Sequence, residues 1–429
     1  MSGRSFGRGR GRFHGATADA LAFTHPSTPG HLGSAAPSRT LRNVAIVRVM
    51  VVTESWKPST NGVVRSVEQV VTHLLGRGAE VALVAPGAEQ DVPDGVARVL
   101  ATPSLHVTRL GYSTSVPTTG LRSFLRDVAP DVVHVASPFL LGAQAVRAAA
   151  DASIPSVAVY QTDVAAFAVA NGYAFAERPV WRWIAGIHRR ATLNLACTDD
   201  AVTDLRAHDV PRVRRWHRGV DLDLFTPTAR TAAWRRRLTG GRDVPVVGYM
   251  GRLAPEKELG LLSSLAGRDD VALALIGDGP SRTDLAARLP GAVLTGRLEG
   301  AELAAAVASL DVFVHPGRHE TLCQAAMQAM ACGVPAVVPA AGGVAELVDE
   351  RTGSHFTPGS TASLAAAVGR VLADRDARGA RAHAVSLTRG IEASVAELAT
   401  HHAEAVALHR GRPGSGAPAL TAPTRRSAA

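Results

Sequence analysis

An arginine and a lysine lie five residues apart in the segment MGRLAPEKELG, at Arg252 and Lys257. The segment follows an apolar run, so both cations lie where a predicted strand ends and a predicted helix begins. A guanidinium offers a planar pair of donors and an ammonium a compact point charge, and beside a helix N-terminus the two suit a diphosphate. Helix capping accounts for Pro255 and Glu256, but not for two neighbouring cations. The chain has only one other lysine, Lys57.

A carboxylate, Glu320, occupies a comparable place in the segment HPGRHETLCQAAMQAMACGVP at 315–335. It ends a loop, and a helix is predicted to begin directly after it. Backbone N–H groups at this helix start favour an anion, and they belong to Thr321, Leu322 and Cys323. The alternative is that Glu320 only stabilises the dipole of the helix.

A glycine in the first half of the chain is the third candidate. Gly62 follows Asn61 and a loop containing Lys57, and it precedes apolar residues at helical spacing. Glycine lets a ligand approach the backbone at a helix N-terminus, although a loop glycine that merely starts a helix is an equally good interpretation. No G-x-G-x-x-G follows a strand, so a dinucleotide fingerprint is not supported.

The elements that must position these residues alternate between strand and helix. VAIVRVMVV, which starts at Val44, is typical of a strand buried on both faces of a parallel sheet. Similar units recur along the chain, and a polar linker near 226–243 divides them into two series. We therefore predict an α/β protein with two tandem Rossmann-like domains rather than one barrel. The predicted parts are a disordered basic tail (1–43), an N-terminal Rossmann-like domain (44–226), a C-terminal Rossmann-like domain (227–385), a C-terminal helix that packs back on the N-terminal domain (386–409) and a second disordered tail (410–429).

Charge and composition exclude several other classes. The net charge of +9 comes from residues 1–46, which carry +5, and residues 410–429, which carry +4, so the part between is neutral. A nucleic-acid partner is therefore not expected. Three cysteines, Cys197, Cys323 and Cys332, match no zinc motif and favour a reducing compartment. The chain has no run of eighteen or more apolar residues, so a transmembrane helix is not expected.

The order of these motifs resembles the retaining glycosyltransferases with the two-Rossmann GT-B fold and a Glu-x7-Glu motif. The resemblance covers residues 46 to about 408 and is closest to actinobacterial GDP-mannose-dependent α-mannosyltransferases. The segments that carry it are TESWKPSTNGVVRSVEQVV, HVASPFLLGAQAV, VAVYQTDVAAFA, RGVDLDLF, GYMGRLAPEKE, ALIGDGPSR and DVFVHPGRHETLCQAAMQAMACGVPAVVPAAGG. It implies that the N-terminal domain (44–226) is the acceptor-side domain and that the C-terminal domain (227–385) is the nucleotide-sugar-binding domain. The donor would then bind in the cleft between them.

The resemblance also implies roles for individual residues. Arg252 and Lys257 would clamp the donor diphosphate, which Gly62 would approach from the other domain. Glu320 would bond the transferred sugar, and the backbone N–H groups of residues 321–323 would face the sugar and phosphate. Gln161 stands where many relatives have a histidine beside the sugar, and Asp163 becomes a candidate on the acceptor side.

One position departs from the family pattern. Eight residues after Glu320 the family has a second glutamate that holds the ribose, whereas this chain has Gln328. An amide offers one acceptor oxygen where a carboxylate offers two, so we expect donor binding to be weaker by about 1–2 kcal/mol. One alternative function is therefore that of a non-catalytic relative that only binds a nucleotide sugar. The other alternative is a nucleotide-sugar epimerase on the same fold.

The implied reaction is transfer with retention, with the two cations and helix N-termini stabilising the leaving group. No cofactor and no metal ion are expected, because in the implied reaction these cations and helix N-termini replace the metal ion that other glycosyltransferases use. The resemblance implies a lipid-linked or glycolipid acceptor, and hence a cytoplasmic protein that contacts an anionic membrane surface transiently. The basic, aromatic stretch 178–190 suits such a surface, but a core stripe containing Trp183 and Ile187 is the favoured interpretation.

Overall fold

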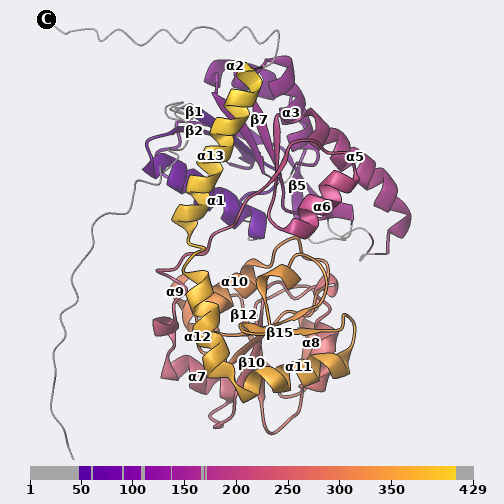
Figure 1. The fold of residues 1–429 in the computed structure, drawn as a ribbon, viewed down its shortest axis with the longest axis vertical. Helices are drawn as coiled ribbons and strands as arrows, with labels where there is room; N and C mark the ends of the chain where they lie inside the picture. Colours follow the sequence, from indigo (N-terminus) through magenta and orange to yellow (C-terminus); the bar gives the residue numbers. More distant parts are fainter. Residues whose placement is uncertain are drawn as a thin grey trace, which may run out of the picture. The chain divides into compact units, whose positions relative to one another are not determined.

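The computed structural model describes residues 48–58, 61–88, 91–107, 112–136, 138–165, 169 and 172–411. The predicted tails, apart from residues 410 and 411, lie outside these residues, as does the start of the first predicted strand at Val44. Within the described residues, two parallel sheets follow one another along the chain (Figure 1).

The first sheet has the strand order β3-β2-β1-β6-β7-β8-β9, and all its pairs are parallel. β1 lies in the centre, and its residues from Val49 to Thr53 are buried, as expected for a strand covered on both faces. Its strands are β1 (Arg48–Thr53), β2 (Glu80–Pro86), β3 (Arg98–Thr102), β6 (Val132–Ala136), β7 (Ser156–Tyr160), β8 (Leu193–Ala196) and β9 (Val213–Arg215). A separate antiparallel hairpin of β4 (Ser104–Val107) and β5 (Tyr112–Ser115) was not predicted.

Helices connect the strands of this half. α1 (Gly62–Gly76) shows why they form where they do: Val64, Val67, Val71 and Leu74 recur at helical spacing and are buried, and Asn61 caps the first turn. The others are α2 (Leu121–Val128), α3 (Leu141–Asp151), η3 (Ala174–Ala176, a 3₁₀ turn), α5 (Glu177–Arg190) and α6 (Asp199–Ala207).

The second sheet repeats the plan with the order β12-β11-β10-β13-β14-β15, again parallel. Its strands are β10 (Val246–Met250), β11 (Ala272–Ile276), β12 (Val293–Gly296), β13 (Val312–Val314), β14 (Ala336–Pro339) and β15 (Gly353–Phe356). Its helices are α7 (Ala232–Thr239), α8 (Arg282–Arg288), α9 (Gly300–Ala308), α10 (Gln324–Ala331), α11 (Thr361–Ala373) and α12 (Arg375–Ser386), with the 3₁₀ turns η4 (Pro227–Ala229), η5 (Pro255–Lys257), η6 (Leu259–Ser264) and η7 (Ala345–Leu347).

Three local predictions were wrong. The polar stretch 226–243 is not only a linker, because it contains η4 and α7. The helix predicted after Arg252 is a pair of 3₁₀ turns separated by Glu258, whose φ of 51° interrupts an α-helix. In α5 the buried stripe contains Trp181, Ile184 and Ile187, whereas Trp183 is 47% exposed.

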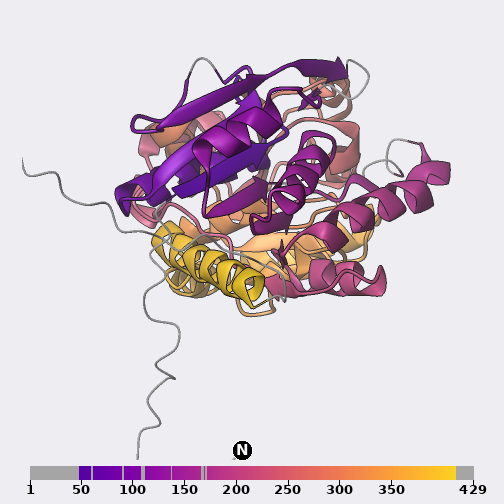
Figure 2. The same cartoon turned by 90° about the horizontal axis from the view of Figure 1, so that it is seen from above.

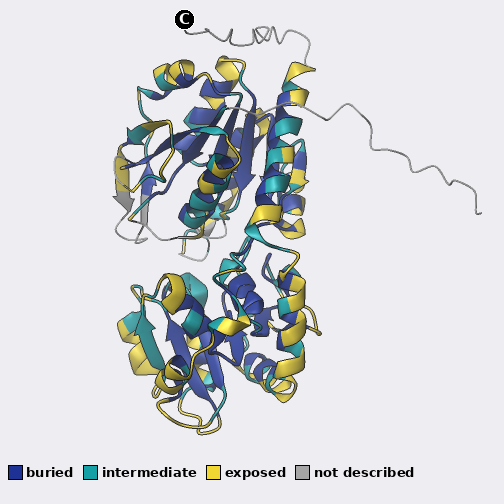
Figure 3. Ribbon diagram, turned by 90° about the vertical axis from the view of Figure 1, so that its left-hand side faces the viewer, coloured by how far each residue is buried: buried dark blue, intermediate teal, exposed yellow. Residues whose placement is uncertain are grey.

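The last helix, α13 (Ile391–Arg410), lies against the first half although it follows α12 of the second. It contacts α1 and strands β6, β7 and β8, and Figures 1 and 2 show it in yellow beside that half from two directions. His402 of α13 reaches His134 of β6 at 3.1 Å between ring nitrogens, and both side chains are buried. Figure 3 shows both sheets buried under helices whose outer faces are exposed.

Candidate active site

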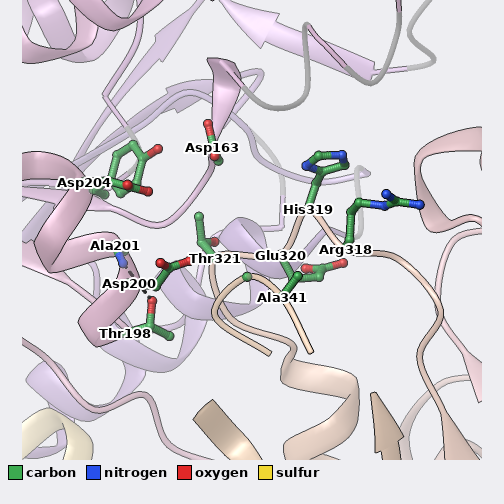
Figure 4. Close-up of a pocket in the computed structure, with 12 residues that line it drawn as sticks. Asp163, Thr198, Asp200, Ala201, Asp204, Arg318, His319, Glu320, Thr321 and Ala341 are labelled. Carbon is green, nitrogen blue, oxygen red and sulfur yellow. Dashed lines mark hydrogen bonds between the residues drawn. The ribbon is translucent and has the colours of Figure 1, made fainter. Parts of the chain in front are cut away.

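A cavity of about 280 Å³ is lined by side chains from both halves (Figure 4). Asp163, Glu320 and Thr321, three of the residues predicted from the sequence, lie in its wall. The complete lining is Tyr160, Asp163, Thr198, Asp200, Ala201 and Asp204 from the first half, and Arg318, His319, Glu320, Thr321, Ala341 and Gly342 from the second. These residues follow strands β7, β8, β13 and β14, so the cavity lies at the carboxyl ends of both sheets, where α/β folds bind ligands.

Glu320 is held by two basic groups. Lys257 Nζ contacts its Oε1 atom, and His315 Nε2 lies 3.2 Å from the same oxygen. Burial by itself would raise the pKa of the Glu320 carboxyl, but Lys257 and His315 outweigh it and lower that pKa to about 2. Glu320 is therefore a charged hydrogen-bond acceptor at neutral pH, and it lies in the wall of the cavity.

Arg252 lies on the loop that follows β10, beside Lys257. Its guanidinium contacts Glu256, and its carbonyl accepts a 2.9 Å hydrogen bond from the Tyr249 hydroxyl. Glu256 thus pairs with Arg252, rather than serving only the helix dipole. Each of the two predicted cations has a carboxylate partner, and a diphosphate would have to compete for both.

Gly277 and Gly279, in the IGDGP turn after β11, allow this turn to pass close to the loop that carries Arg252. A Cβ atom on Gly277 would lie 2.0 Å from the carbonyl oxygen of Gly251, and one on Gly279 would lie 2.4 Å from that of Leu253. Both glycines also have φ values near 150°. The IGDGP turn therefore packs directly against the backbone of the Arg252 loop, which is a structural role.

Gln161 lies at the junction of the two halves. Its carbonyl accepts a 2.8 Å hydrogen bond from Thr321 Oγ1, and its side-chain Oε1 accepts one of 2.6 Å from Arg218. Arg218 is 7% exposed and lies over the Trp216 ring. Sequence reasoning missed Arg218, although it begins the RGVD segment that follows β9.

The loop after Glu320 differs from its predicted form. α10 begins at Gln324 with Cys323 as its N-cap, so the N–H groups of residues 324–326, not 321–323, lie in the first helical turn. The Cys323 side chain is buried, and Leu322 packs against buried apolar side chains of both halves. Gln328 lies on α10 and is 6% exposed.

The structure does not place Gly62 in the wall of the described cavity. Asn61 Oδ1 accepts from the N–H groups of Val63 and Val64 at 3.0 Å, so two donors of this helix N-terminus are already satisfied. Nothing lies within 4 Å of a Cβ atom added to Gly62. These contacts fit both a loop glycine at the start of a helix and a backbone position that a ligand can approach. Lys57 also lies apart from the cavity lining and pairs with Glu68 at 2.9 Å.

A second bridge between the halves involves Glu346, whose role was not predicted. Its carboxylate accepts hydrogen bonds from the backbone of Asp199 at 2.9 Å and Asp200 at 2.7 Å, the first residues of α6. Arg215 lies 3.1 Å away. Gly343 allows the close approach of the halves, because a Cβ atom there would lie 2.8 Å from Thr198 Cγ2 of the first half.

The residues that the structure describes hold neither a cluster of metal ligands nor a membrane-spanning helix. No cluster of three or more His, Cys, Asp or Glu side chains among those residues could hold a metal ion. Across the same ranges, every helix is too short or too polar to cross a membrane.

The two halves match two family models. Residues 60–224 match Glycosyltransferase Family 4, and residues 244–374 match Glycosyl transferases group 1. Among curated proteins, a GDP-mannose-dependent alpha-mannosyltransferase of Mycolicibacterium smegmatis is 45% identical over 366 residues, which is 83% of this chain and 97% of that protein. A GDP-mannose-dependent alpha-(1-6)-phosphatidylinositol dimannoside mannosyltransferase of Mycobacterium tuberculosis is 26% identical, covering 72% and 83%.

Solved structures share the fold. Sucrose-phosphate synthase from Thermosynechococcus elongatus superposes with a TM-score of 0.69 at 19% identity, covering 84% of this chain and 99% of that one. Anabaena HepE, solved in complex with UDP, gives 0.67 at 19% identity, covering 83% and 100%. At this identity the likeness establishes the architecture of two Rossmann-like domains, as predicted.

Proposed function

Because the chain belongs to the same glycosyltransferase family as the mycobacterial α-mannosyltransferase described above, we propose that it transfers mannose from GDP-mannose with retention at the sugar carbon. The acceptor in this proposal is a glycolipid or another lipid-linked sugar. The observation that carries the proposal is the pairing of Lys257 with Glu320 at the cavity, with Arg252 on the same loop. In this proposal Arg252 and Lys257 bind the donor diphosphate, and Glu320, which lines the cavity, binds the transferred sugar.

The two cations explain how the leaving group departs. As the bond between the sugar carbon and the phosphate oxygen breaks, negative charge grows on the diphosphate. Arg252 and Lys257, whose side chains are partly buried, would stabilise that charge where charged contacts are stronger than in bulk solvent. The proposal needs no metal ion, because these side chains provide the positive charge.

Retention follows if the acceptor approaches from the face that the leaving group vacates. The acceptor oxygen then bonds to the sugar carbon on that face, and its proton passes to the departing diphosphate. Glu320 would accept hydrogen bonds from sugar hydroxyls and fix the ring during this exchange. Gln161, held by Arg218, and Asp163 lie on the side of the first half, from which the acceptor would come.

A second groove supports an acceptor with a sizeable head group. It measures about 780 Å³, runs between α5 and α6, and shares Asp163 and Asp204 with the first cavity. Relatives are named for acceptors of this kind, as in the phosphatidylinositol dimannoside enzyme. Phe175 and Trp183, 83% and 47% exposed, lie on or beside α5 with several arginines. We place the enzyme in the cytoplasm, with transient contact to an anionic membrane surface through this region.

Calorimetric titration tests the donor assignment. GDP-mannose should bind, while UDP-glucose and UDP-N-acetylglucosamine should bind at least tenfold more weakly. Lys257→Ala should abolish measurable binding, whereas Lys57→Ala, the matched change at the other lysine, should leave it unchanged. Equal binding of all three nucleotides, or equal effects of the two lysine variants, would contradict the proposal.

Product analysis tests the transfer. GDP-mannose is incubated with vesicles that contain a diacylglycerol glycoside, with and without EDTA. The proposal expects GDP release, an α-linked mannosyl product and no effect of EDTA. Donor binding without any transfer would favour a binding protein, and conversion of the sugar without GDP release would favour an epimerase.

A further inference from the structure

His315 is a buried polar residue for which the sequence offered no role. It follows β13 and is 2% exposed. Its ring stacks on Tyr249 at 6.0 Å between centroids, and the Tyr249 hydroxyl bonds the Arg252 carbonyl. The His315 Nε2 atom pairs with Glu320 Oε1 at 3.2 Å, but neither ring nitrogen meets hydrogen-bond geometry within the described ranges. Buried polar groups of this kind are rare, so the side chain requires an explanation.

One carboxylate, one thiol and one phenol face His315. Glu320 Oε1 lies 3.2 Å from Nε2, the Cys323 thiol lies beside the ring, and Tyr249 covers one face. Burial by itself would lower the pKa of His315, but Cys323 and Glu320 outweigh it and raise that pKa to about 9. At neutral pH, Glu320 therefore has two cationic neighbours, His315 and Lys257.

One carboxylate does not need two cations for charge balance. The second becomes necessary if the first is drawn away, and a diphosphate bound by Lys257 would do that. A buried carboxylate left without a partner is strongly destabilised. His315 is fixed at the end of a strand and stacked on Tyr249, so it would stay beside Glu320 while Lys257 binds the phosphate.

We propose that His315 is the positioning residue of this active site, which keeps Glu320 charged and oriented when the donor diphosphate engages Lys257. The inference rests on the proposed function, since it assumes a diphosphate at Lys257. It assigns His315 no contact with the substrate and no proton transfer to it.

The test compares His315→Gln, which keeps an amide donor near Nε2, with His315→Phe, which keeps only the ring. With GDP-mannose and glycoside vesicles, kcat should fall about 10-fold in His315→Gln and about 100-fold in His315→Phe, as expected for loss of a charged interaction. The donor KM should change less than threefold. Wild-type kcat should decline as the pH rises through about 9, and the variants should lack this decline. His73→Gln, on the surface of α1, is the control.

Two results would overturn the inference. One is a kcat within twofold of wild type in His315→Phe. The other is a parallel loss of kcat, calorimetric GDP-mannose affinity and thermal stability, with the wild-type pH profile retained, since that pattern indicates a purely structural role. Failure of the wild-type protein to bind GDP-mannose would instead refute the proposed function, so the two failures are distinguishable.

Discussion

Thr321 and Gln161 join the two halves of the chain: the Thr321 hydroxyl donates a 2.8 Å hydrogen bond to the Gln161 carbonyl. Thr321 directly follows Glu320, and the Gln161 side chain is held by Arg218. The residue beside the proposed sugar-binding carboxylate is therefore anchored to the acceptor side. This bond fixes the residue next to Glu320 relative to the first half.

Removal of this bond should weaken donor binding. Thr321→Val keeps the volume of the side chain and removes its hydroxyl, at a cost of about 1 kcal/mol. The dissociation constant for GDP-mannose should rise about fivefold by calorimetry. Thr400→Val, which removes an exposed bond within α13, serves as the control. Unchanged affinity in Thr321→Val would mean that this contact does not contribute to the donor-bound form.

Replacing Gln328 by the glutamate that the family has at this position should strengthen the binding of GDP-mannose. We expect Gln328→Glu to lower the dissociation constant for GDP-mannose about tenfold, because a carboxylate can accept from both ribose hydroxyls. Without ligand, Gln328→Glu should melt at a lower temperature than the wild type, because position 328 is 6% exposed and burial of a charge is unfavourable. Calorimetry and thermal denaturation measure the two effects.

The control for that variant is Gln324→Glu, which adds the same charge one turn earlier on α10. Gln324 donates a 2.9 Å hydrogen bond to the Gly219 carbonyl, so this change should destabilise the protein without improving affinity. If Gln328→Glu behaves like Gln324→Glu, the ribose does not bind beside position 328.

Lys257 and Glu320 could each be selected from the sequence by residue type and position, but their contact could not. Lys257 follows β10 and Glu320 follows β13, and these strands are neighbours in the second sheet. Loops at the carboxyl ends of adjacent parallel strands meet, which explains why the structure brings the two side chains together. The two Rossmann-like domains could be predicted, since their buried strands form distinct apolar runs.

His315, Arg218 and Glu346 could not be assigned roles in this way. Each role depends on a contact between segments distant in the sequence or on the direction of a side chain, and neither is visible in residue spacing. The 3₁₀ turns after Arg252 were missed because Glu258 adopts a left-handed conformation that its residue type does not favour. In α5, Trp181 and Trp183 are two residues apart and face opposite environments, so a small error in helix phase exchanged them.

The charge on Glu320 should make stability depend on acid pH. Its pKa is about 2 in the folded protein against an ordinary value of 4.5, so the unfolded chain takes up the proton first as the pH falls. The stabilisation is complete above about pH 5 and is lost as the pH falls towards 2. Glu320→Gln should therefore melt below wild type at pH 7, with Lys257 and His315 unpaired, and the difference should shrink in acid.

Thermal denaturation between pH 7 and pH 3 measures this change, with the exposed Glu302→Gln as the control. A difference between Glu320→Gln and wild type that is constant over this range would show that Glu320 is not held as a charged group by its two neighbours.

Loss of the Glu346 bridge should destabilise the protein. Glu346 accepts two backbone hydrogen bonds at the start of α6 and pairs with Arg215, so it caps a helix of the other half. Glu346→Gln removes the charge and one acceptor oxygen, and caps of this kind contribute about 1 kcal/mol. The free energy of unfolding in urea should fall by about that amount, whereas Glu350→Gln, at an exposed position nearby, should leave it unchanged. Equal stability of the two variants would show that the α6 N-terminus does not depend on Glu346 for its cap.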